Sequence, residues 1–149
     1  MKFASAIAVV AVTVAALGAT AVLAQQDPIA ARKALMKANG EGAGAIAKMV
    51  KGEAPFDQAT AQKSFASFQD AAAKMPDLFP ENSKTGGDTA ALPKIWENMA
   101  DFKARFVKLG DDSKAAAASV KDLDNLKEAF GNVGKNCGGC HEMYRLKKS

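Results

Sequence analysis

The chain has 149 residues, of which 48% are hydrophobic and 24% are charged, and its formal net charge at pH 7 is +4. This length corresponds to one domain with a single core of modest size. The charge is far from the dense basic patch that nucleic-acid binding requires, so we expect no nucleic-acid partner.

The N-terminal segment has the features of a secretory signal peptide. Lys2 precedes a long apolar run rich in Ala and Val, and Val22 and Ala24 are small residues three positions and one position before a cut. The alternative is a membrane anchor, since the uncharged stretch is long enough to span a bilayer. Alanine dominates it and no basic residues follow directly, which favours cleavage. We expect removal of residues 1–24 and a soluble periplasmic domain, residues 25–149, without stable membrane insertion.

Two helices are predicted in the first half of this domain. Asp27 and Pro28 are typical of a helix start, and apolar residues recur with helical period over 27–50. After a turn that contains Gly and Pro, Asp57 can cap a second helix over 57–75. The apolar stripe of the second helix consists of Ala61, Phe65, Phe68, Ala72 and Met75.

Two further helices follow a polar crossover rich in Pro and Gly. Pro93 begins a third helix over 93–118, and Asp122 begins a fourth over 122–147. The apolar seam of the fourth helix is Leu123, Leu126, Phe130, Val133, Cys137, Cys140 and Tyr144. No segment alternates convincingly as a strand does. Two short connections and one long one predict an all-α fold, an antiparallel four-helix bundle, in which side chains from facing helices can hold a cofactor.

The fourth helix ends in a motif that contains both cysteines and the single histidine of the chain, Cys137-Gly-Gly-Cys140-His141. On a helix these three side chains share one face and reach the same object. Cys-x-x-Cys-His is the attachment signature of haem c, in which each sulfur forms a thioether to a vinyl group and the imidazole meets the iron. We therefore predict one haem c, held by Cys137 and Cys140, with His141 as an iron ligand.

Three other readings of the motif are weaker. A disulfide between Cys137 and Cys140 would close a very short loop with poor helical geometry. A thioredoxin-like redox pair needs a βαβ context, which the pattern lacks. A zinc site needs a fourth ligand, and no other Cys or His exists in the chain.

With these residues the chain resembles the class II c-type cytochromes, the cytochrome c′ family, which carry the haem motif at the end of the last of four helices. Among them it is most similar to the low-spin cytochrome c-556 type, in which a methionine of the first helix binds iron opposite the histidine. The resemblance implies that Met36 is this ligand. It is carried by the segments RKALMKANG, KGEAPFDQA, LFPENS, PKIW and CGGCHEMYR.

The residues around Met36 are consistent with that role. Arg32 lies one turn before it, and Gly40 and Gly44 lie one and two turns after it, so that this face can admit a porphyrin edge. Arg32 can pair with a haem propionate through its planar fork, although a solvated surface arginine is the alternative. Methionines in regular apolar seams, such as Met75 and Met99, are more typical of core packing.

Two functions are possible, depending on whether Met36 binds the iron. If it binds, the iron is six-coordinate and low-spin, which suits an electron carrier that exchanges electrons with other redox proteins. If it does not bind, the iron is five-coordinate and high-spin, and the protein binds nitric oxide or carbon monoxide. The c-556-like first helix favours the carrier. We expect no enzyme activity, and either a monomer or a homodimer.

Overall fold

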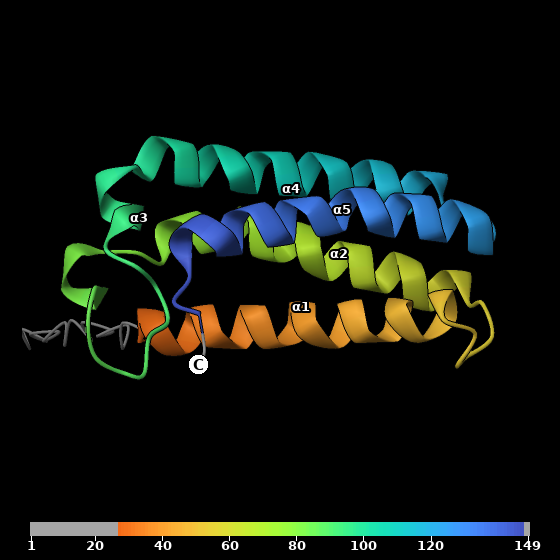
Figure 1. The fold of residues 1–149 in the computed structure, drawn as a ribbon, viewed down its shortest axis with the longest axis horizontal. Helices are drawn as coiled ribbons and strands as arrows, with labels where there is room; N and C mark the ends of the chain where they lie inside the picture. The colour runs from red at the N-terminus through yellow and green to blue at the C-terminus, as the bar shows by residue number, and fades with distance from the viewer. Residues whose placement is uncertain (1–26, 148–149) are drawn as a thin grey trace, which may run out of the picture.

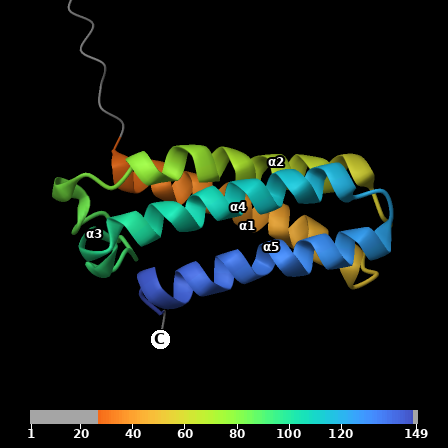
Figure 2. The same cartoon turned by 90° about the horizontal axis from the view of Figure 1, so that it is seen from above.

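The computed structural model describes residues 27–147. Four long helices run lengthwise beside one another, and short helices cover one end of them (Figures 1 and 2). In chain order the elements are α1 (Pro28–Val50), α2 (Gln58–Lys74), the 3-10 helices η1 (Met75–Asp77) and η2 (Glu81–Ser83), α3 (Lys94–Glu97), α4 (Met99–Ser119) and α5 (Leu123–Tyr144). The predicted four-helix bundle is confirmed, whereas the signal peptide predicted for residues 1–24 lies outside the described residues.

Three of the four predicted helix starts are confirmed by side-chain caps. Asp27 accepts a hydrogen bond from the backbone of Ile29 at 2.9 Å, and Asp122 accepts one from the backbone of Asn125 at 2.8 Å. Asp57 accepts from the first backbone amides of α2. Each carboxylate therefore satisfies a donor that has no partner within its helix.

The third and fourth helices differ from their predicted bounds. The segment predicted as one helix over 93–118 is broken at Asn98, whose φ of −128° and ψ of 44° separate α3 from α4. The last helix ends at Tyr144 rather than at residue 147.

The chain beyond Tyr144 leaves the helix because it pairs with the crossover that precedes α3. The backbone amide of Leu92 donates to the carbonyl of Tyr144 at 3.0 Å, and that of Leu146 donates to the carbonyl of Ala90 at 2.8 Å. Ala91 and Arg145 form an antiparallel bridge between them. These backbone bonds replace those that a longer helix would have made.

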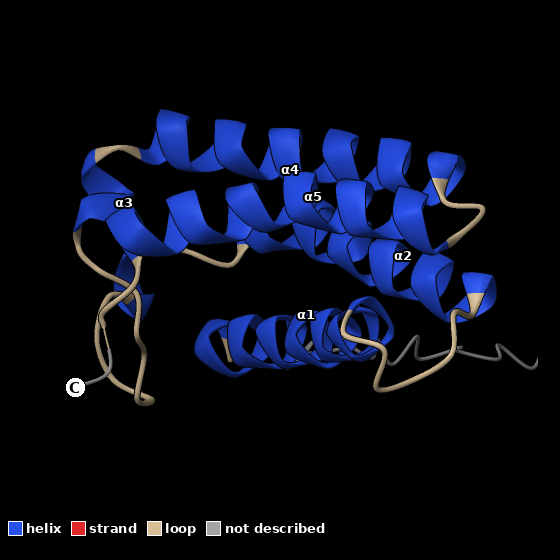
Figure 3. Cartoon of the chain, turned by 45° about the vertical axis from the view of Figure 1, so that its right-hand side comes forward, coloured by secondary structure: helices blue, strands red, loops and turns tan. Residues whose placement is uncertain are grey.

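The four long helices do not pack equally closely. α2 packs against α1 and α4, and α4 packs against α5, whereas α1 and α5 make the fewest contacts of these neighbouring pairs. Figure 3 shows α1 set apart from α4, with α2 and α5 between them. The edge between α1 and α5 is thus the part of the bundle that its own side chains close least.

The core follows the predicted apolar stripe of the second helix, whose five residues are all buried, whereas in α1 the buried apolar residues are Ile29, Ile46 and Met49. Side chains from all four long helices and from α3 are almost fully buried, among them Ile46, Phe65, Phe68, Met75, Ile95, Phe102, Phe106, Leu126 and Val133. Gly42 lets α1 approach α2, since a Cβ there would lie 3.2 Å from the Cβ of Ser64. Within residues 27–147, no helix combines the length and apolar character needed to cross a bilayer.

Candidate functional site

The Cys-x-x-Cys-His motif forms the last turns of α5. Cys137 is exposed, Cys140 and His141 are half-buried, and neither thiol is in a disulfide. Burial raises the pKa of the Cys140 thiol, so this group is protonated at neutral pH. Burial, and then the charge of Arg145, lower the pKa of His141. The imidazole is therefore neutral at pH 7, which is the form that ligates a metal.

A glycine gives open access to the same face of α5. Gly134, Cys137 and His141 follow one another at helical spacing and lie on one side of the helix. Gly134 is half-buried, yet a Cβ at this position would meet no atom within 4 Å. A flat group can therefore approach the backbone directly beside Cys137 and His141, and the residues present fit a porphyrin.

Met36 lies on α1, the helix that borders the open edge of the bundle. Its side chain is half-buried and packs against the core. Met75, by contrast, is 1% exposed, so its predicted core role is confirmed, while Met99 is only half-buried. Met36 is thus the partly buried methionine of α1, since Met49 on the same helix is 3% exposed.

Gly40 lies one turn after Met36 on nearly the same face of α1, whereas Gly44, two turns after it, is turned further away. Both are exposed, and they line a surface hollow of about 510 Å³ beside the turn that follows α1. The reason is geometric, since a step of four residues turns a helix by about 40° beyond a full turn. Two such steps carry Gly44 well away from Met36.

Arg32 is buried against the crossover, so it is not the solvated surface arginine that was the alternative. It is 5% exposed, and its guanidinium lies 4.3 Å from the centroid of the Phe79 ring. Nη1 donates to the carbonyl of Leu78 and to Oγ of Ser83, both at 3.0 Å. Nη2 donates to the carbonyl of Ser83 at 3.0 Å and to Oγ1 of Thr89 at 3.2 Å. Both terminal nitrogens therefore contact the crossover, and pairing of Arg32 with a haem propionate stays a prediction.

A polar cluster on α4, not predicted from the sequence, contacts the other side of the motif. Arg105 donates to Asp101 at 2.7 Å and to the sulfur of Met143 at 3.0 Å. Tyr144 donates its hydroxyl hydrogen to the same carboxylate at 2.5 Å. The spacing of Asp101 and Arg105, four residues apart on a helix, is the signal that could have revealed this cluster. The hydrogen bond from Arg105 directs Met143 toward α4, so the sulfur of Met143 already has a partner next to the motif.

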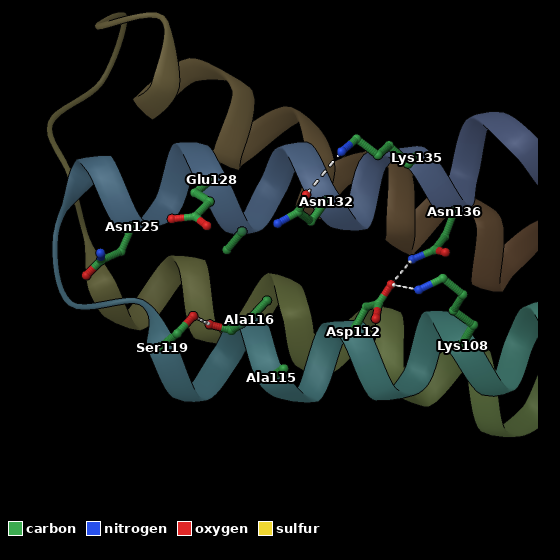
Figure 4. A pocket seen from close by; sticks show the side chains of 11 residues that line it. Lys108, Asp112, Ala115, Ala116, Ser119, Asn125, Glu128, Asn132, Lys135 and Asn136 are labelled. Carbon is green, nitrogen blue, oxygen red and sulfur yellow. Dashed lines mark hydrogen bonds and ion pairs between the residues drawn. The ribbon is translucent and has the colours of Figure 1, made fainter.

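A second hollow, of about 530 Å³, lies between α4 and α5 (Figure 4). Asn136 of α5 donates to Asp112 of α4 across it at 2.7 Å, and Lys108, also on α4, donates to the same carboxylate at 2.8 Å. Its lining mixes polar side chains with alanines and lies on the α4 side of α5. The predicted site residues, Cys137, Cys140, His141, Met36 and Arg32, do not contribute to this lining.

Comparisons with known proteins agree with the motif. A family model described as Cytochrome C′ matches residues 27–145. A cytochrome c′ of Rhodopseudomonas palustris is 53% identical over 133 residues, which cover 89% of this chain and 91% of that protein. A cytochrome c-556 of Agrobacterium fabrum is 43% identical over 118 residues, with 78% and 80% covered. A solved structure of cytochrome c′ from R. palustris has a TM-score of 0.81 at 54% identity, and covers 84% of this chain and 100% of that one.

Proposed function

The chain belongs to the cytochrome c′ family and carries one covalently attached haem c, and from this premise we propose that it is a periplasmic electron carrier with His141 and Met36 as axial ligands. The observation that carries the proposal is the place of Met36. It is half-buried on α1, and α1 is one of the two helices that border the least closed edge of the bundle. Relatives of this chain include both a cytochrome c′ and a cytochrome c-556. Ligation of the iron by Met36 would distinguish the two candidate functions.

Each residue of the proposed site has one task. When bound, haem c supplies a one-electron couple at its iron. Cys137 and Cys140 hold the porphyrin edge on α5, and the neutral imidazole of His141 offers its nitrogen on the same face. The thioether of Met36 is a soft ligand, which raises the reduction potential. With His141 and Met36 as two fixed ligands, the bound iron would need little rearrangement on changing charge, and this would favour rapid electron exchange.

We also infer the kind of partner from the surface around the motif. Lys135, Arg145 and Lys147 are exposed near the end of α5. Positive charge there attracts acidic redox proteins and speeds their encounter. The rate of electron exchange with such a partner should then fall as ionic strength rises.

An absorption spectrum of the purified holoprotein tests the proposal. We expect a low-spin oxidised state with a sulfur-to-iron charge-transfer band, and a ferrous state that resists carbon monoxide. A high-spin spectrum and ready carbon monoxide binding would instead establish the alternative, a five-coordinate cytochrome c′ that binds nitric oxide or carbon monoxide.

A further inference from the structure

We propose that the segment of residues 78–92, here called the strap, sets the separation of α1 and α5, and that Arg32 is the positioning residue that anchors it. The proposal rests on the proposed function, because that separation decides whether Met36 reaches an iron held by His141. Three sets of contacts carry it.

The first set ties the strap to α1. The guanidinium of Arg32 makes four hydrogen bonds to three strap residues, Leu78, Ser83 and Thr89. Ser83 is 1% exposed, so water cannot replace Arg32 as its partner without structural change. A planar fork that donates from both terminal nitrogens fixes orientation as well as distance. Loss of the fork removes the donor to the carbonyl of the buried Ser83, which is costly, while the Ser83 hydroxyl still donates to the carbonyl of Pro80 at 2.8 Å.

The second set ties the strap to α5. The backbone of Leu92 donates to the carbonyl of Tyr144, and the backbone of Leu146 donates to the carbonyl of Ala90. Tyr144 is three residues after His141 on the same helix. The strap is therefore joined by main-chain bonds to the turn of α5 that carries the predicted iron ligand.

The third set is a chain of aromatic contacts that runs beside the strap. The ring of Phe79, on which Arg32 lies, is 4.7 Å from that of Phe102, centroid to centroid. The ring of Phe102 is in turn 5.3 Å from that of Tyr144. Both pairs have edge-to-face geometry, which adds attraction beyond area burial. Trp96 donates to the carbonyl of Phe79 at 2.9 Å and holds this part of the strap in place.

The two anchors lie close in sequence to the two proposed ligands. Arg32 is one helical turn before Met36, and Tyr144 is about one turn after His141. Direct packing between α1 and α5 is sparse. The strap thus fixes the positions of two helices that hold each other weakly, at the end of the bundle where the ligands lie.

The test compares Arg32→Gln with Lys37→Gln. Each variant removes one positive charge from α1, but Lys37 is exposed and forms an ion pair with Glu41 on the surface of the same helix. We would measure the high-spin fraction of the ferric holoprotein, carbon monoxide binding by the ferrous form, and the thermal midpoint. Arg32→Gln should give a mixture of spin states and faster carbon monoxide binding, and Lys37→Gln should match the wild type. Ser83→Ala should move the spectrum in the same direction by a smaller amount.

A third variant separates positioning from general stability. Leu126 is 0% exposed and lies near the start of α5, far along the helix from the motif, so Leu126→Ala lowers the thermal midpoint without touching the strap. It should remain low-spin. If Arg32→Gln also remains low-spin while its midpoint falls, Arg32 is only a stabilising residue and the proposal is wrong. If Arg32→Gln fails to fold, Ser83→Ala is decisive instead. A Ser83→Ala variant that remains low-spin would then show that the proposal is wrong. A high-spin wild type refutes both the proposed function and this inference.

Discussion

The hydroxyl of Tyr144 lies 2.5 Å from Oδ2 of Asp101, so a single hydrogen bond joins the end of α5 to the first turn of α4. Arg105 donates to the same oxygen. The hydrogen bond from Arg105 lowers the pKa of Asp101 most, and the hydrogen bond from Tyr144 lowers it further. Charged and aromatic groups of both helices thus meet next to the haem motif.

This contact predicts a pH dependence of stability. An aspartate whose folded pKa is lowered stabilises the fold above its ordinary value of about 3.9, and the contribution is lost as the pH falls through the lower folded pKa. The thermal midpoint of wild-type holoprotein should therefore exceed that of Asp101→Asn at neutral pH, and the gap should narrow below that value. Circular dichroism melts across the acid range measure it. A gap that stays constant with pH would show that the charge of Asp101 is irrelevant.

Met36→Ala tests the proposal that Met36 is the sixth ligand of the iron. The haem should stay attached, since His141 and both cysteines remain on α5, while the iron becomes high-spin and the reduction potential falls. Carbon monoxide should then bind readily to the ferrous form. Absorption spectra and a redox titration measure these changes.

Met75→Ala is the matched control for Met36→Ala. Because Met75 is 1% exposed, its truncation should cost about 2 to 5 kcal/mol as a core cavity. The spin state should not change. If Met36→Ala alters only the rate of carbon monoxide entry into a wild type that is already high-spin, Met36 is a steric gate.

Cys137→Ala and Cys140→Ala should each yield little mature holoprotein. A cofactor bound only by the native state stabilises it, so chains without attachment should be poorly packed and degraded. Haem staining of denaturing gels and the intact mass report the covalent bond. Gly139→Ala is the control, because its Cβ would make ordinary contact, 3.6 Å from Arg105, and both thiols remain. A stable, haem-free protein containing zinc or a disulfide would contradict the prediction.

Gly134→Val should lower the haem content, because the new side chain would occupy the open approach beside Cys137 and His141. Gly131→Val is the matched control on the same helix, where the residue is exposed. There, replacing glycine should gain a few tenths of a kcal/mol in helix propensity, with haem content unchanged. The ratio of haem to protein absorbance measures the difference. Equal haem content in the two variants would mean that the porphyrin does not approach Gly134.

The sequence was sufficient for features that depend on local chemistry. Asp27, Asp57 and Asp122 cap helices because a carboxylate near free amides needs only its neighbours in the chain. The stripe that contains Phe65 and Phe68 is buried because its period matches a helix.

The role of Arg32 depends on distant partners and could not be predicted in this way. Its acceptors, such as Ser83 and Thr89, lie in an irregular segment with no period. The break at Asn98 is missed for a related reason, since the apolar pattern continues across it. The pairing of residues 90–92 with 144–146 has no local signal either.

The sparse contact between α1 and α5 also has a consequence for the order of assembly. These are the first and last helices, so bringing them together closes the longest loop in the bundle, whereas α1 with α2 and α4 with α5 are joined by short turns. We expect the two hairpins to form first and this edge to close last. A cofactor bonded to α5 and ligated from α1 would act on that final step. Its effect would then be seen chiefly as slow unfolding, a kinetic form of stability.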